Sequence, residues 1–143
     1  MRISLIGLWL AAVCLAGFTR LFTPLFVGRW QGRMINIHPA LLPAFKGLDT
    51  HRQALAAGVK IHGASVHFVV PDMDSGPIIA QGAVAVRDDD TAATLADRVL
   101  AIEHRIYPAA LALLAAGRVT IVDGRCRIEG AASDSGHLIV PEI

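Results

Sequence analysis

Hydrophobic and polar positions follow two different periods along this chain, and the change of period predicts strands separated by helices. Apolar runs or strict alternation, which are typical of strands, occupy residues 12–17, 33–38, 61–70 and 78–86. A helical period or helix-boundary residues mark residues 21–30, 50–57 and 92–116. Because the two kinds of element alternate, the pattern predicts an α/β fold with a mostly parallel sheet flanked by helices.

Boundary residues give two of the predicted helices their ends. Thr23 and Pro24 suit the Ncap and N1 positions of the first helix. Thr50 is expected to cap the second helix, and Gly58 is expected to end it.

The length of the chain predicts a single domain. Its 143 residues, of which 54% are hydrophobic and 17% charged, are enough for one domain of ordinary size. We expect this domain over residues 1–129, with an atypical lead-in at 1–11 and a flexible tail at 130–143. The pair Asp123-Gly124 predicts the turn of a small closing hairpin near its end.

Charge and cysteine content exclude several kinds of partner. The net charge of +1 gives no electrostatic reason to expect nucleic acid or a strongly acidic partner. Cys14 and Cys126 match neither a metal-binding spacing nor a disulfide framework, which fits a cytoplasmic location.

The first residues admit two interpretations. Arg2 precedes an apolar run from Ile3 to about Phe18, which is typical of a secretory signal peptide and shorter than the roughly 20 residues of a transmembrane helix. A fully buried parallel strand is equally apolar. Periodicity does not separate the two interpretations, so both stay open, and no membrane partner is expected.

Two polar side chains stand out at the end of the second predicted strand. Asn36 and His38 alternate with Ile35 and Ile37, so they share one face of that strand. An amide can stabilise a developing oxyanion, and an imidazole can move a proton near neutral pH. These groups suit acyl transfer without a covalent enzyme intermediate, because no nucleophile elbow is present.

Each of these residues also has an ordinary structural interpretation. Asn36 can fix a loop backbone, His38 can be a packed core histidine, and Asp74 before a Ser-Gly pair is a common turn residue. His62, His67 and His104 show no spacing that is typical of a metal site, so no metal is expected.

Several motifs occur together in a characteristic order. They are "CLAGFTRLFTP", "NIHPALLPAFKGLDTHRQAL", "HGASVHFV", "DMDSGPIIAQ" and "IEHRIYP". Between about residues 12 and 122 the chain therefore resembles the phosphoribosylglycinamide formyltransferase family. The resemblance implies a Rossmann-type formyltransferase fold. It also implies transfer of a formyl group from 10-formyltetrahydrofolate to the amine of glycinamide ribonucleotide in purine synthesis, without a metal.

The resemblance also implies roles for individual residues. Asn36 would bind the formyl oxygen, His38 would be the general acid and base, and Asp74 would pair with His38 and favour its charged form. Ser65 and His67 would support the folate pocket. The implied folate-binding residues are Thr19, Arg20, Leu21, Phe22, Asn36, Val69 and Asp72, and the implied nucleotide-binding residues are Gly17, Pro39 and Glu103. At position 19 the family commonly has Met.

The chain also departs from the family pattern. No glycine-rich phosphate-binding turn precedes residue 17, so we expect a domain truncated at its N-terminus, with impaired activity and weak nucleotide binding. An exposed sheet edge would then favour self-association. The alternatives are a formyltetrahydrofolate hydrolase-like enzyme, an inactive fragment, half of a split enzyme, or a small exported protein. A tRNA formyltransferase is disfavoured because no basic patch is present.

Overall fold

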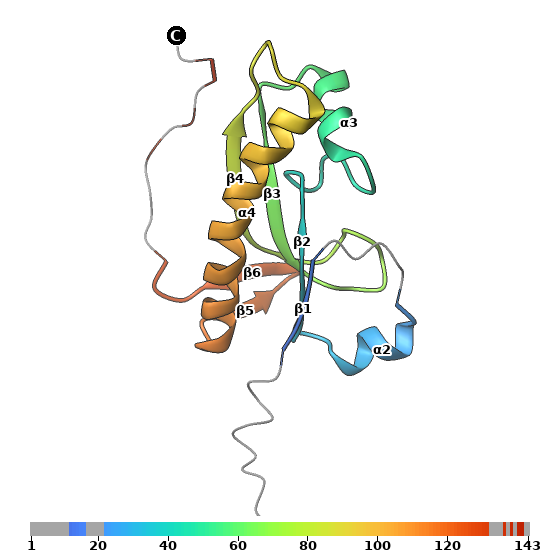
Figure 1. Ribbon diagram of the computed structural model, residues 1–143. Coiled ribbons are helices and arrows are strands. Elements are labelled where there is room, and N and C mark those ends of the chain that lie inside the picture. Colours follow the sequence, from blue (N-terminus) through green and yellow to red (C-terminus); the bar gives the residue numbers. More distant parts are fainter. Residues whose placement is uncertain (1–11, 17–21, 132–135, 137, 139, 142–143) are drawn as a thin grey trace, which may run out of the picture.

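A computed structural model of the chain describes residues 12–16, 22–131, 136, 138, 140 and 141. Its elements are β1 (Val13–Leu15), α2 (Pro24–Arg29), β2 (Met34–His38), α3 (Thr50–Ala57), β3 (Ile61–Phe68), β4 (Ile78–Ala85), α4 (Ala92–Ala115), β5 (Val119–Val122) and β6 (Arg125–Ile128). The α/β class predicted from the sequence is therefore confirmed. Figure 1 shows the long helix α4 lying along the main sheet, with α3 near one end of the strands and α2 near the other.

The main sheet has the strand order β1-β2-β3-β4, and its pairing is mixed. Strand β1 is parallel to β2, whereas β2 with β3 and β3 with β4 are antiparallel. The prediction of a mostly parallel sheet is therefore wrong for the described strands. The register pairs His38, the last residue of β2, with Ser65, so β3 begins beyond the end of β2. The loop and the short helix α3 therefore keep the connection at that end of the sheet, and β3 returns antiparallel to β2.

The ends of α2 and α3 differ in how well the sequence predicted them. The Thr23 side chain accepts a hydrogen bond from the Phe26 amide, and a proline opens the helix, as expected. At α3, Asp49 occupies the Ncap position with φ of 53° and makes no side-chain cap. Thr50 is the first helical residue and donates its hydroxyl to the Pro39 carbonyl at 2.6 Å, so the expected Thr50 cap is wrong. Its hydroxyl ties down the preceding loop instead.

The hydrophobic core lies between the sheet and α4. Buried apolar side chains of β2 and β3 pack with side chains of α4 there; they include Ile35, Ile37, Ala64, Val66, Phe68, Leu95, Val99 and Ala110. The strand alternation then places Asn36, His38, Ser65 and His67 on the opposite face, and the register pairs Asn36 with His67 and His38 with Ser65. The polar face predicted from the sequence is confirmed at these four positions.

The remaining predictions concern the helix α4 and the chain ends. Helix α4 has the predicted extent, and β5 and β6 form the predicted hairpin around Asp123 and Gly124, which both have positive φ. Residues 1–11 and most of 130–143 lie outside the described part, so the lead-in and the tail stay predictions. Within the described ranges, no helix combines the length and hydrophobicity that a membrane crossing demands.

Candidate active site

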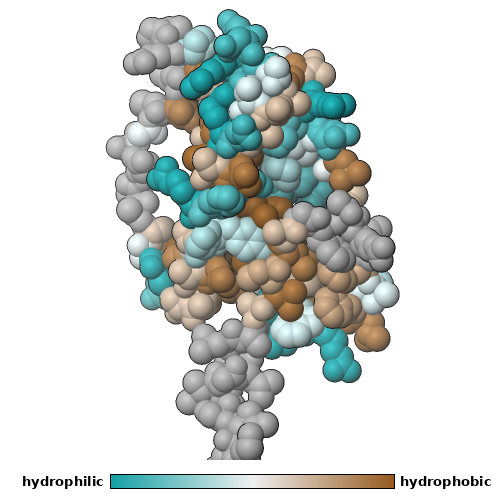
Figure 2. Space-filling model, viewed as in Figure 1, coloured by the Kyte–Doolittle hydropathy of each residue, from teal (hydrophilic) through white to brown (hydrophobic). Residues whose placement is uncertain are grey.

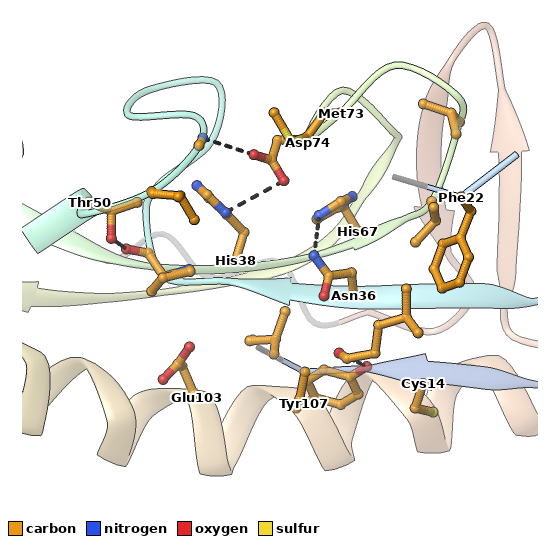
Figure 3. Close-up of a pocket in the computed structure, with 18 of the residues that line it drawn as sticks. Cys14, Phe22, Asn36, His38, Thr50, His67, Met73, Asp74, Glu103 and Tyr107 are labelled. Carbon is orange, nitrogen blue, oxygen red and sulfur yellow. Dashed lines mark hydrogen bonds and ion pairs between the residues drawn. The ribbon is translucent and has the colours of Figure 1, made fainter. Parts of the chain in front are cut away.

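A cavity of about 1040 Å³ opens where β1 and β2 end. Its walls come from these strands, from the loops after β2 and β3, and from one face of α4. Figure 3 shows His38, Asn36 and His67 above the strand β2 and Glu103, Tyr107 and Cys14 on the side of α4. The cavity therefore lies at the carboxyl ends of two parallel strands, which is the usual ligand position in open α/β sheets.

His38, the last residue of β2, lies between two hydrogen-bond acceptors. Its Nδ1 atom is 3.5 Å from Oδ1 of Asp74, and its Nε2 atom is 2.8 Å from the Phe45 carbonyl oxygen. A carboxylate and a carbonyl oxygen both require an N–H from the ring, so both contacts are satisfied only when each ring nitrogen carries a hydrogen. The ring is thus oriented through both nitrogens, with Nδ1 toward the Asp74 carboxylate and Nε2 toward the loop carbonyl.

Asp74 is held by the loop that covers the end of β2. Its Oδ2 atom accepts a hydrogen bond of 3.0 Å from the Gly47 amide, which leaves Oδ1 for His38. Asp74 has φ of 53°, a left-handed conformation that Asp adopts more readily than most residues. Nearby, Lys46 donates to Ser75 at 2.9 Å, so the loops after β2 and β3 are joined at two points.

Asn36 lies opposite His67 on the same face of the sheet. The Asn36 Nδ2 and His67 Nε2 atoms are 3.4 Å apart, and His67 Nδ1 is 2.9 Å from the Phe68 carbonyl oxygen. Burial lowers the pKa of His67, and this effect outweighs the raising effect of the Phe68 hydrogen bond and the Asp74 carboxylate. The ring is therefore neutral at pH 7.

A second pair of histidines supports the loop after β2. His51 Nδ1 and His62 Nε2 are 3.1 Å apart, and the ring of Phe45 packs edge-on against His62 with centroids 6.0 Å apart. Burial, followed by the neighbouring His51, lowers the pKa of His62 to about 4. Because Phe45 also supplies the carbonyl that binds His38, this pair helps to position the candidate acid.

Ser65 holds the same loop from beneath the cavity. Its hydroxyl donates to the Ala40 carbonyl at 2.7 Å and accepts from the Leu42 amide at 3.0 Å and from Gln81 at 2.9 Å. Ser65 is fully buried and lies outside the cavity lining, so it supports the pocket indirectly.

The wall formed by α4 carries one acidic and one phenolic side chain. Burial raises the pKa of Glu103, although His104 and His38 oppose the shift. The Tyr107 hydroxyl lies 2.6 Å from the Leu15 carbonyl oxygen and 3.1 Å from that of Ile35, and so fixes the end of β1 against β2.

All of the described residues to which the sequence predicted a catalytic, folate-binding or nucleotide-binding role line this cavity, whereas Ser65, predicted to support the pocket, does not. They are Phe22, Asn36, His38, Pro39, Val69, Asp72, Asp74 and Glu103. The other predicted residues, Gly17, Thr19, Arg20 and Leu21, lie outside the described ranges. The roles of all of these residues stay predictions. No group of three or more histidine, cysteine or acidic side chains in the described part of the chain is placed to hold a metal ion.

Sequence reasoning missed the backbone groups that hold the site. The Phe45 carbonyl and the Gly47 amide fix His38 and Asp74, yet a backbone group has no signature in the sequence. Tyr107 was missed as a wall residue, although it stands in the quoted "IEHRIYP" motif on the face of α4 that meets the strands.

Comparisons with known proteins agree with this geometry. The profile of the formyl transferase family matches residues 9–111. The chain is 55% identical over 109 residues to the trifunctional purine biosynthetic protein adenosine-3 of Homo sapiens, which covers 76% of this chain and 11% of that protein. It is 45% identical over 118 residues to the phosphoribosylglycinamide formyltransferase of Escherichia coli (strain K12), covering 82% of this chain and 56% of that one.

A solved structure has the same architecture. The crystal structure of phosphoribosylglycinamide formyltransferase from Anaplasma phagocytophilum matches with a TM-score of 0.82 and 46% identity, over 85% of this chain and 60% of that one. This likeness confirms the Rossmann-like α/β fold that the resemblance implied. The chain spans little more than half the length of the bacterial relative and a ninth of the human one.

Proposed function

Because the chain belongs to the formyl transferase family, we propose that its cavity transfers a formyl group from 10-formyltetrahydrofolate to the amine of glycinamide ribonucleotide. The observation that carries the proposal is the placement of His38 between Asp74 and the Phe45 carbonyl, in the same cavity as the Asn36 amide. An acid and an oxyanion donor beside one cavity are the parts that acyl transfer to an amine requires.

The reaction follows from these groups. The substrate amine attacks the formyl carbon, and the Asn36 amide donates to the formyl oxygen as it becomes negative. When the bond from the formyl carbon to N10 of the folate breaks, His38 gives a proton to N10. The amine loses one proton, which returns to His38 through water. The His38 contact with Asp74 at 3.5 Å is longer than an ordinary hydrogen bond, so Nδ1 can also meet a substrate atom.

The remaining walls suit the two substrates. Phe22 and Val69 offer apolar surface to the flat pterin ring, and Asp72 offers an acceptor at the cavity edge. We assign to Glu103, which lines the cavity from α4, the acceptance of hydrogen bonds from the ribose hydroxyls of the nucleotide. We assign Thr19, Arg20 and Leu21 to the folate side and Gly17 to the nucleotide side, and all four lie outside the described residues.

The assay compares two fates of the formyl group. The purified chain is incubated with 10-formyltetrahydrofolate with and without glycinamide ribonucleotide, and formylated nucleotide and free formate are measured by mass spectrometry. We expect formylated nucleotide when glycinamide ribonucleotide is present. With Asn36→Ala, the rate at which this product forms should fall by about 100-fold. Formate release that is independent of the amine would support the hydrolase alternative and contradict this proposal.

Self-association through β1 is the finer proposal about partners. In the described sheet β1 is an edge strand, and edge strands offer unpaired backbone groups to another chain. Figure 2 shows hydrophobic side chains gathered over the lower part of the molecule, and Leu25, Phe26 and Leu100 are exposed. Light scattering during gel filtration tests this proposal, and a monomer at all concentrations contradicts it.

The free thiols of Cys14 and Cys126 support a cytoplasmic location.

A further inference from the structure

The Asn36 side chain has one hydrogen bond in the described part of the molecule. Its Nδ2 atom meets Nε2 of His67 at 3.4 Å, whereas its Oδ1 atom is buried and has no partner among the described residues. Figure 3 shows the Asn36 amide turned toward His67. The orientation of this amide therefore depends on which hydrogen-bonding role His67 offers to it.

The Phe68 carbonyl decides that role. A carbonyl oxygen only accepts hydrogen bonds, so His67 Nδ1, at 2.9 Å, must carry the hydrogen. A neutral imidazole then has a lone pair at Nε2, and this lone pair accepts from an Asn36 N–H. With the Asn36 amide flipped, Oδ1 would face the Nε2 lone pair, and the two acceptors would repel each other.

We propose that His67 is a positioning residue that fixes the Asn36 amide as a donor toward the substrate. Its Nε2 lone pair holds one Asn36 N–H, so the second N–H is directed at an incoming carbonyl oxygen. This inference rests on the proposed formyl transfer for its chemical meaning, but the hydrogen-bond chain from Phe68 through His67 to Asn36 is a property of the protein alone. The arrangement also predicts which ligand group the Asn36 amide prefers. That group is a carbonyl oxygen, because a hydrogen-bond donor in its place would face the Asn36 N–H, which is also a donor.

The neighbours of His67 determine when this arrangement exists. The charged or titratable groups that act on the ring are Asp74 and His38. A proton added to Nε2 would turn His67 into a donor and turn Oδ1 of Asn36 toward it. The neutral Nδ1–H tautomer is therefore the form that supports transfer.

The first experiment observes the tautomer directly. The chain labelled with ¹⁵N is studied at pH 7.5 by long-range ¹H–¹⁵N correlation of its histidine rings, with His67→Gln to assign the signal. We expect a protonated Nδ1 and an unprotonated Nε2, and the Nε2 signal should move when Asn36 is replaced by Leu. A protonated Nε2, or a signal that Asn36→Leu leaves unchanged, overturns the inference whether or not the chain transfers formyl groups.

The second experiment separates positioning from general support. In His67→Gln, the longer amide can place an acceptor near the Nε2 position, whereas His67→Asn keeps only a donor for Phe68. We expect kcat to fall roughly 10- to 100-fold in His67→Asn and less than about 10-fold in His67→Gln, with KM for the folate nearly unchanged in both. Equal losses in the two variants, or losses confined to KM, contradict the inference. Absence of transfer by the unaltered chain rejects the proposed function, and the spectrum still decides the tautomer.

Discussion

The His38 imidazole and the Asp74 carboxylate lie 3.5 Å apart, and their side chains are only 6% and 9% exposed. They come from β2 and from the loop after β3, so the antiparallel pairing of these strands brings them together. Because little water competes for either group, the attraction between them is stronger than it would be on the surface.

The replacement Asp74→Asn tests the value of this contact. The Asn side chain keeps an oxygen for the Gly47 amide, so the loop should hold its position. The negative charge beside His38 is lost, and we expect kcat for formyl transfer to fall by about 100-fold. Steady-state kinetics measure this, and Asp97→Asn on the exposed face of α4 is the matched control with an unchanged rate. A kcat within threefold of the unaltered chain would mean that Asp74 serves the loop alone.

The sequence predicted the composition of the site better than the geometry of the sheet. A period of two residues placed Asn36 and His38 on one face, because a strand leaves no other choice. Their meeting with Asp74 came from the family resemblance. The direction of β3 was not predictable, because it depends on how the loop after β2 is held by Thr50 and by Ser65 beneath it.

The histidine pair predicts how stability depends on pH. His51 and His62 share one hydrogen bond, and burial lowers the pKa of both, that of His62 to about 4. In the unfolded chain the usual pKa is about 6.5, so the unfolded state binds more protons between pH 6.5 and 4. The stabilisation is therefore complete above pH 6.5 and is lost as the pH falls through this window.

Urea denaturation at pH 7 and pH 5 measures this loss. We expect the free energy of unfolding to fall by about 1–2 kcal/mol from this source. In His62→Gln, which has no ring to protonate, the fall should be clearly smaller. Equal pH dependence in both proteins would show that His62 carries its proton in the folded state.

Two aspartates before α4 allow a comparison of a buried and an exposed ion pair. Asp90, with a side chain 2% exposed, binds the Arg98 guanidinium and accepts from the Arg87 amide and the Thr94 hydroxyl. The hydrogen bond from Arg98 holds the pKa of Asp90 well below its usual range. Asp88 pairs with Lys60 at 3.5 Å, but its side chain is 98% exposed.

We therefore expect the same change to have different effects at these two sites. Asp90→Asn should lower the free energy of unfolding by about 2 kcal/mol, because charged hydrogen bonds are lost in a site with little water. Asp88→Asn should change it by less than about 0.5 kcal/mol. Thermal and urea unfolding at pH 7 compare them, and equal effects would show that the low exposure of Asp90 adds nothing to its ion pair.

Two glycines, one in the sheet and one in α2, differ in the space that a larger side chain would find. A Cβ atom added at Gly63 of β3 would lie 1.9 Å from the Gly82 carbonyl oxygen and 2.9 Å from its carbon, and this backbone of β4 cannot move without breaking the sheet pairing. At Gly28 in α2 the added atom would meet nothing within 4 Å. We expect Gly63→Ala to destabilise the fold by about 2–3 kcal/mol through overpacking. We expect Gly28→Ala to stabilise it by about 0.5–1 kcal/mol, because alanine loses less backbone entropy than glycine when a helix forms. Urea unfolding of both variants gives the signs, and a destabilised Gly28→Ala would show that α2 does not keep its helical conformation in solution.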